Sequence, residues 1–165
     1  MCIRDSNWPA ERVAEAGRVA HELGVAPPCA AQLPYSLIAR DWVEDPAMTE
    51  ALLACGAKVV ASYVLAGGIL SGKYGAGAGG RMAGEVAAAR WEGAVRAARE
   101  LGALADEVGT RPAVLALAFA LLNSGVATIL FGATSPEQVR ENVAAVEVAG
   151  SLTESQLERL RTIGL

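Results

Sequence analysis

The stretch from Pro112 to Pro136 contains no charged residue, so it is either a membrane span or a buried part of a folded core. Asn123-Ser124-Gly125 near its middle is a turn signal, and each half is too short to cross about 30 Å of hydrocarbon. We therefore expect a buried helix, Pro112 to Leu122, followed by a buried strand, Val126 to Phe131. A strand of near-continuous apolar sequence is typical of a parallel sheet covered on both faces, so the stretch predicts an α/β fold.

The rest of the chain alternates between short strands and helices. Further strands are expected at Cys29 to Leu33 and Lys58 to Ser62, and a Gly-rich loop at about Tyr63 to Gly84. Helices are expected at Pro9 to Leu23, Pro46 to Cys55, about Glu85 to Val108, Pro136 to about Ala145, and from about Thr153 onward. Strands that alternate with helices indicate parallel β-α-β units, and about three strands are few for a complete domain of this class.

Size, charge and cysteine content narrow the class of protein. The 165 residues suffice for one domain with a core, and the net charge of −4 argues against a nucleic-acid or anionic-membrane partner. Cys2, Cys29 and Cys55 are an odd number without C-x-x-C spacing, so neither a disulfide framework nor a zinc site is expected. A reducing cytoplasm fits this pattern best.

Two glycine patterns match phosphate-binding motifs, but the residues around each pattern argue against such a loop. Gly75 to Gly80 matches G-x-G-x-x-G, but no strand leads straight into it, as a dinucleotide fingerprint requires. Gly67 to Lys73 matches the front of a P-loop, but Tyr74 stands where a Ser or Thr hydroxyl must hold Mg²⁺. Nucleoside triphosphatase chemistry is therefore not expected.

The segment from Phe131 to Asn142 points to a binding site. The expected strand ends at Gly132, and Thr134-Ser-Pro is a helix-entry signature. Gln138, Glu141 and Asn142 then lie three and four residues apart on one helical face, close to a positive helix N-terminus. This geometry suits an anion and a ribose, and the alternative is an ordinary capped surface helix.

Four motifs in this order resemble the C-terminal half of the aldo-keto reductases. They are Ser6-Asn7-Trp8, Gln32, Leu65 to Tyr74, and Gly132 to Asn142. They are especially similar to the branch that includes bacterial reductases and the potassium-channel β-subunits. The resemblance implies that residues 6–165 form the C-terminal half of a TIM (β/α)8 barrel, an α/β fold with about three parallel strands and flanking helices. It also implies an NADPH-dependent oxidoreductase that reduces aldehydes and ketones.

The resemblance assigns cofactor roles residue by residue. Ser6, Asn7 and Gln32 would hydrogen-bond the nicotinamide carboxamide. The residues that would line the pyrophosphate are Tyr63, Val64, Leu65 and Gly67 through their main chain, with Lys73 and Arg81. Glycines there let the main chain approach phosphate oxygens closely.

The adenosine end completes the implied site. Gly132 and Thr134 would lie by the adenosine phosphate, and Gln138, Glu141 and Asn142 would grip the adenosine. Some family members place Arg where this chain has Gln138, which weakens the preference for NADPH and leaves NADH as the alternative cofactor. The family often stacks an aromatic residue on the nicotinamide where this chain has Ser62, so either Tyr63 substitutes or the stack is absent.

No catalytic residue is assigned, because the family's Asp, Tyr, Lys and His set lies on the first half of the barrel. None of Asp5, Tyr35, Lys58 or His21 matches those motifs. The chain alone is therefore expected to be inactive. The expected partner of the parent protein is a small carbonyl substrate, and the sequence does not predict an oligomeric state. A regulatory subunit like the channel β-subunits and an inactive, truncated remnant are the alternatives.

The first residues are expected to be foreign to the fold. Met1 to Ser6 reverse-translates as ATG TGT ATA AGA GAC AGC or AGT, which matches the end of a transposon adapter used for sequencing libraries. We therefore expect residues 1–5, and all but the last base of the Ser6 codon, to derive from that adapter. A half-barrel would leave two open sheet edges, so the isolated chain is expected to be marginally stable and to dimerise or aggregate.

Overall fold

Four parallel strands form one sheet in the computed structural model, which describes residues 3–76 and 88–165. The strands are β1 (Ile3–Ser6), β2 (Pro28–Pro34), β3 (Lys58–Ser62) and β4 (Val126–Ile129). They lie in the order β1-β2-β3-β4, and each neighbouring pair is parallel. A sheet whose strand order follows chain order is expected for part of a (β/α)8 barrel, so the predicted fold class is confirmed.

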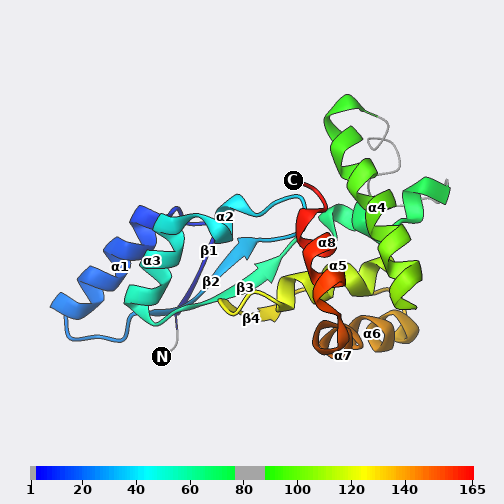
Figure 1. The fold of residues 1–165 in the computed structure, drawn as a ribbon. Helices are drawn as coiled ribbons and strands as arrows, with labels where there is room; N and C mark the ends of the chain where they lie inside the picture. Colours follow the sequence, from blue (N-terminus) through cyan, green and yellow to red (C-terminus); the bar gives the residue numbers. More distant parts are fainter. Residues whose placement is uncertain (1–2, 77–87) are drawn as a thin grey trace.

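Helices connect and cover the strands (Figure 1). The α-helices are α1 (Ala10–Glu22), α2 (Asp41–Glu44), α3 (Pro46–Cys55), α4 (Glu92–Val108), α5 (Pro112–Leu121), α6 (Pro136–Val143), α7 (Ala145–Ser151) and α8 (Glu154–Thr162). There are also three short 3-10 helices, η1 (Ala66–Ser71), η2 (Lys73–Ala76) and η3 (Ala89–Trp91). The first two lie within the expected loop, and η3 lies within the helix expected from about Glu85. In the view of Figure 1, α1 and α3 pack against each other to the left of the strands, and α4 to α8 lie to the right.

Local capping explains why several predicted bounds are correct. The Asp45 carboxylate accepts hydrogen bonds from the N–H groups of Ala47 and Met48 at 2.8 and 3.1 Å, and Pro46 takes the first helical position of α3. Gly56 ends the helix in the left-handed conformation at φ 64°. Helix α3 and the following β3 therefore have the bounds that the sequence predicts.

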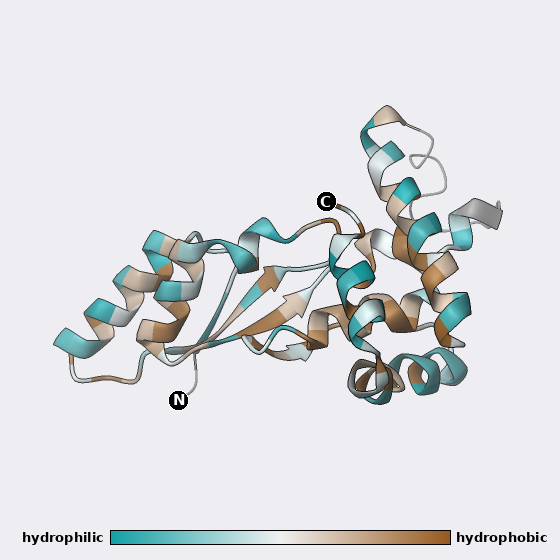
Figure 2. Cartoon of the chain, viewed as in Figure 1, coloured by the Kyte–Doolittle hydropathy of each residue, from teal (hydrophilic) through white to brown (hydrophobic). Residues whose placement is uncertain are grey.

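Helix α5 forms the centre of the core, as the charge-free sequence predicts. Every residue from Val114 to Ala120 is buried, and Figure 2 shows the apolar colour along this helix. The strand that follows differs from the prediction. β4 ends at Ile129 rather than Phe131, and Ala127 and Thr128 are exposed. Within the described residues β4 pairs only with β3, so it is an edge strand. The exposure of Ala127 and Thr128 shows that β4 is not covered as its apolar sequence indicated.

Strand β1 adds a fourth strand that the sequence did not predict, because Arg4 and Asp5 remove its apolar pattern. Asp5 is 5% exposed, and among the described residues neither of its carboxylate oxygens has a hydrogen-bond partner. Burial raises the pKa of Asp5, and the nearby backbone N–H of Trp8 offsets only part of that rise. The neighbouring Cys55 thiol also has a raised pKa, through burial first and the Asp5 charge second. β1 therefore holds against the core an acidic group whose charge is only partly compensated.

The expected helix from Pro136 to Ala145 is two helices, and the cysteines also differ from expectation. The N–H of Ala144 bonds to the carbonyl of Glu141, which tightens the last turn of α6, and α7 begins at the next residue. Cys55 is a free thiol, but Cys29 is disulfide-bonded. The sequence argues against a disulfide framework, but an odd number of cysteines still allows one pair, and Cys29 belongs to such a pair.

No helix in the described part of the chain is long and apolar enough to cross a membrane.

Candidate functional site

The carboxyl ends of β1, β2 and β3 meet at one edge of the sheet. Ser6 lies opposite Gln32 in the β1–β2 register, and the N–H of Asn7 donates to the carbonyl of Gln32 at 3.0 Å. Asn7 and Tyr63, which directly follow β1 and β3, have positive φ values of 57° and 59°. Such conformations cost roughly 1–3 kcal/mol in a residue with a side chain, and they cluster at ligand sites. The edge therefore brings the three predicted carboxamide-binding residues together.

A cleft of about 600 Å³ opens next to this edge, within the range of small-molecule sites. Its walls come from the segment after β3, the start of α5, and the segment from the end of β4 into α6. The predicted residues that line it are Tyr63, Val64, Leu65, Gly67, Lys73, Gly132, Gln138, Glu141 and Asn142. Residues separated by about half the chain thus share one cavity, as the resemblance implies.

A glycine-rich turn forms one wall of the cleft. Gly67 and Gly68 have φ values of 69° and 94°, and the Ser71 hydroxyl donates to the Gly68 carbonyl at 2.7 Å. A Cβ atom at position 68 would lie 3.0 Å from both Cε and Nζ of Lys73. The absence of a side chain at Gly68 therefore lets the lysine cross the turn, and its ammonium lies 5.0 Å from the centre of the Tyr74 ring. A cation beside accessible main chain is an arrangement that suits a phosphate.

Helix α6 forms the opposite wall and is capped by its own side chains. The Ser135 hydroxyl accepts from the N–H of Gln138 at 3.3 Å, and the side-chain oxygen of Gln138 accepts from the N–H and hydroxyl of Thr134 at 2.8 and 3.2 Å. This capping directs Gln138, Glu141 and Asn142 toward the cleft, and Asn142 is 8% exposed. Thr134 lines a separate hollow beside Val139 and Arg140, so it supports Gln138 rather than the cleft wall.

Arg111 is a cleft residue that the sequence did not predict. It precedes α5, and its Nη1 atom lies 3.0 Å from Oε2 of Glu141 on α6. Gly68, Ser71, Pro112, Ala113 and Leu130 also line the cleft without having been predicted. A helix start at Pro112 is readable from the sequence, but no spacing rule connects Arg111 with a residue on a later helix.

Some predicted residues lie outside the cleft. Ser62 ends β3, and its carbonyl accepts from the N–H of Tyr35 at 2.9 Å, whereas the adjacent Tyr63 lines the cleft and is 45% exposed. Ser6, Asn7 and Gln32 lie at the strand ends and are not among its lining residues. Arg81 lies outside the described residues.

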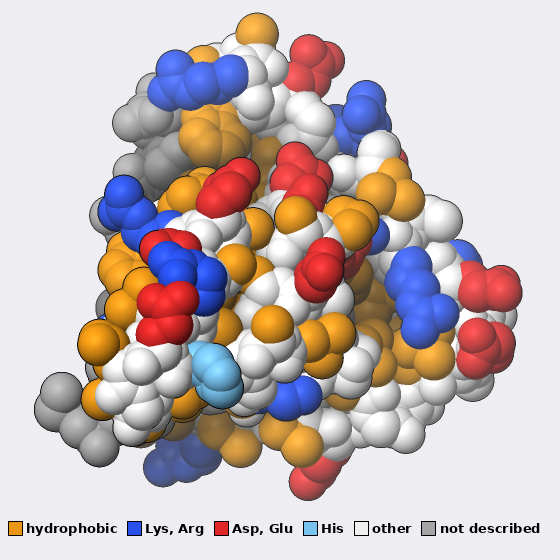
Figure 3. Space-filling model, turned by 90° about the vertical axis from the view of Figure 1, so that its left-hand side faces the viewer, with side chains coloured by type: hydrophobic (Ala, Val, Ile, Leu, Met, Phe, Trp, Pro, Cys, Tyr) orange, Lys and Arg blue, Asp and Glu red, His pale blue; other side chains and the backbone are white. Residues whose placement is uncertain are grey.

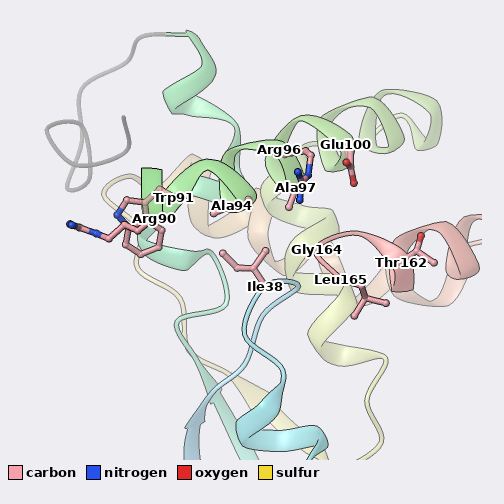
Figure 4. A pocket seen from close by; sticks show the side chains of 11 residues that line it. Ile38, Arg90, Trp91, Ala94, Arg96, Ala97, Glu100, Thr162, Gly164 and Leu165 are labelled. Atoms are coloured by element: carbon pink, nitrogen blue, oxygen red, sulfur yellow. The ribbon is translucent and has the colours of Figure 1, made fainter. Parts of the chain in front are cut away.

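A second cavity of about 300 Å³ lies between the first turns of α4 and the C-terminal residues (Figure 4). Its lining includes Ile38, Trp91, Arg96, Glu100 and Leu165, none of which was predicted as a site residue. The buried indole N–H of Trp91 has no hydrogen-bond partner among the described residues. The cavity holds none of the cofactor motifs, so the nucleotide candidate is the larger cleft.

Tyr35 and His21, two titratable residues of the described part of the chain, lie away from the cleft. The Tyr35 hydroxyl donates to Glu44 at 2.7 Å and accepts from Asn123 at 3.2 Å, and burial is the main cause that raises its pKa to about 12. A proton donor near neutral pH needs a pKa much closer to that pH. His21 is exposed on α1, on a face where Figure 3 shows acidic and basic side chains interspersed. The described residues also contain no group of three or more His, Cys, Asp or Glu able to hold a metal ion.

The cleft residues suit a phosphate-bearing nucleotide, because a cation and a glycine turn face a capped helix across one cavity. Comparison with known proteins places the chain in a family. The chain is 33% identical over 168 residues to "Putative voltage-gated potassium channel subunit beta" of Schizosaccharomyces pombe, which covers 96% of this chain and 48% of that protein. The chain thus spans about half the length of this relative. The model of the aldo/keto reductase family matches residues 3–164, and the chain belongs to that family.

Proposed function

We propose that this chain supplies the nucleotide-binding half of an NADPH-dependent aldo/keto reductase that reduces aldehydes and ketones to alcohols. The observation that carries the proposal is the cleft, which unites the glycine turn after β3 with the polar face of α6. When bound, NADPH would supply the hydride for carbonyl reduction. A cytoplasmic location and a small carbonyl substrate belong to the same proposal.

The chain's own residues would bind and orient the nucleotide. Lys73 and the main chain from Tyr63 to Gly67 would hold the pyrophosphate, because they combine positive charge with close backbone approach. Gly132, Gln138, Glu141 and Asn142 would hold the adenosine end, with Thr134 fixing Gln138. Ser6, Asn7 and Gln32 would hydrogen-bond the carboxamide at the adjoining strand ends, which extends the site along the sheet edge.

The 165-residue chain should bind the nucleotide without turning over substrate, since no described residue has the environment of a catalytic proton donor. Titration of NADPH fluorescence with the purified chain tests the first part. Lys73→Ala should weaken binding several-fold, and Lys58→Ala is the matched control, because Lys58 is exposed and bonds to the Ser124 carbonyl away from the cleft. No saturable binding to the wild type would contradict the proposal. NADPH consumption with 4-nitrobenzaldehyde would contradict the expected inactivity.

A nucleotide-binding regulatory subunit is the second candidate, favoured by the printed name of the Schizosaccharomyces pombe relative. Both candidates predict nucleotide binding, so the discriminating measurement is turnover by a longer protein that contains this sequence. Carbonyl reduction would favour the reductase, and tight binding without turnover would favour the regulatory subunit. The third alternative, an inactive remnant, predicts neither binding nor turnover.

A further inference from the structure

We infer that Arg111 determines whether the cleft accepts a phosphate on the adenosine 2′-oxygen, and so makes NADPH the preferred nucleotide over NADH. The inference rests on the proposed function, since it concerns the nucleotide of that cleft. It assigns the role to a residue of the α4–α5 connection rather than to the α6 motif.

The polar face of α6 is by itself a poor place for a phosphate dianion. Glu141 presents a carboxylate to the cleft with 34% of its side chain exposed, and a nearby phosphate would be repelled by it. Gln138 is neutral, and its oxygen already accepts two hydrogen bonds from Thr134, which leaves only its amide N–H donors. Without a further cation, these residues favour a ribose with free hydroxyls, as in NADH.

Arg111 supplies the missing positive charge at this end of the cleft. Among the described residues that line the cleft, the cations are Lys73 and Arg111. Lys73 lies against Gly68 in the glycine turn, so its charge lies beside the main chain that would hold the pyrophosphate. The Arg111 guanidinium contacts Glu141 at 3.0 Å and is therefore placed beside the α6 face.

The Arg111 side chain can bind a phosphate without losing its position. A guanidinium carries five N–H donors, and the recorded contact with Glu141 uses one nitrogen. With 70% of the side chain exposed, the pair is of the weakly bound surface kind, so a stronger phosphate contact can rearrange it at low cost. The Arg111 backbone is itself extended at φ −93° and ψ 149°, and the next residue, Pro112, fixes the start of α5.

The test compares nucleotides that differ only in the 2′-phosphate. NADPH and NADH are titrated into the 165-residue chain and followed by fluorescence, and 2′,5′-ADP and 5′-AMP serve as competitors. Arg111→Gln should weaken the binding of NADPH and 2′,5′-ADP about tenfold, or ~1.4 kcal/mol, and change the binding of NADH and 5′-AMP less than twofold. Arg111→Lys should recover part of the loss. The effect should shrink as salt is raised, since the contact is exposed.

Arg140→Gln is the matched control. Arg140 has a similarly exposed side chain, 74%, and also pairs with a glutamate, Glu137, but it is not a cleft residue. Arg140→Gln should change all four affinities less than twofold, and thermal unfolding should show both variants folded. Equal losses for NADPH and NADH in Arg111→Gln would overturn the inference and leave the proposed function standing. No binding of either nucleotide to the wild-type chain would overturn both.

Discussion

Replacing Gly68 with alanine would test whether the glycine turn exists to place Lys73 in the cleft. Two costs follow from the structure. At φ 94° any residue with a side chain is strained by about 1–2 kcal/mol. The new Cβ would also lie 3.0 Å from Cε and Nζ of Lys73, so the flexible end of the lysine must leave its present position.

The expected loss of NADPH affinity follows from the displaced ammonium. A hydrogen bond to a charged group contributes about 1.5–3 kcal/mol, and partial exposure of Lys73 reduces this to ~1.4 kcal/mol, or tenfold in Kd. Fluorescence titration measures the affinity, and thermal unfolding measures the backbone strain separately. Gly68→Ala should therefore lower both the unfolding temperature and the affinity.

Gly72→Ala is the control that separates strain from displacement. Gly72 has a similar φ of 78°, but a Cβ there would make only an ordinary contact, 3.7 Å from Pro112. It should cost similar stability and leave NADPH affinity within about twofold, since no cation moves. Equal losses of affinity in the two variants, or none in Gly68→Ala, would refute the role given to Lys73.

Three further predictions concern stability. Burial raises the pKa of Tyr35 to about 12, above its ordinary 10, and this difference contributes ~2–3 kcal/mol to the free energy of unfolding. The contribution is complete below pH 10 and is lost as the pH rises toward 12. Tyr35→Phe should therefore abolish the fall in stability between these pH values in denaturant titrations. Asp5→Val should raise the free energy of unfolding by about 1–3 kcal/mol near pH 7. The gain should shrink toward pH 3, because the raised pKa of Asp5 means that protonation removes the buried charge there. An equal gain at both pH values would show that charge is not the cause. Gly17→Ala should destabilise the chain by ~1 kcal/mol, since its Cβ would lie 2.5 Å from the Cys55 sulfur. When added to Cys55→Ala it should stabilise by ~1 kcal/mol, because alanine favours a helix more than glycine does. Urea denaturation of the double-mutant cycle should show this change of sign.

The sequence predicts this fold where local chemistry decides the structure. The Asp45 cap, Pro46 and Gly56 set the bounds of α3 without help from the rest of the molecule. The burial of β4 depends on which elements lie next to it at the edge of the sheet, and this cannot be predicted from its own apolar residues. β1 was missed for a related reason, since its pairing with β2 holds a strand in place despite Arg4 and Asp5.

The candidate site shows the same division. Glycines and capping residues are close in sequence, so the turn after β3 and the start of α6 were predictable as binding elements. The contact between Arg111 and Glu141 depends on how α5 packs beside α6, and no local pattern records that packing. Contacts between two side chains that are far apart in the sequence are thus the part of the site that the sequence does not predict.

The chain-order sheet has a consequence for synthesis on the ribosome. Each new strand joins the edge formed by the strand made just before it, so the sheet can grow in one direction as the chain emerges. The cleft, however, needs the turn after β3 together with α6, and α6 is made well after β3. A ligand of the cleft can therefore stabilise the nascent chain only after Asn142 has left the exit tunnel, and the earlier intermediates must persist without it.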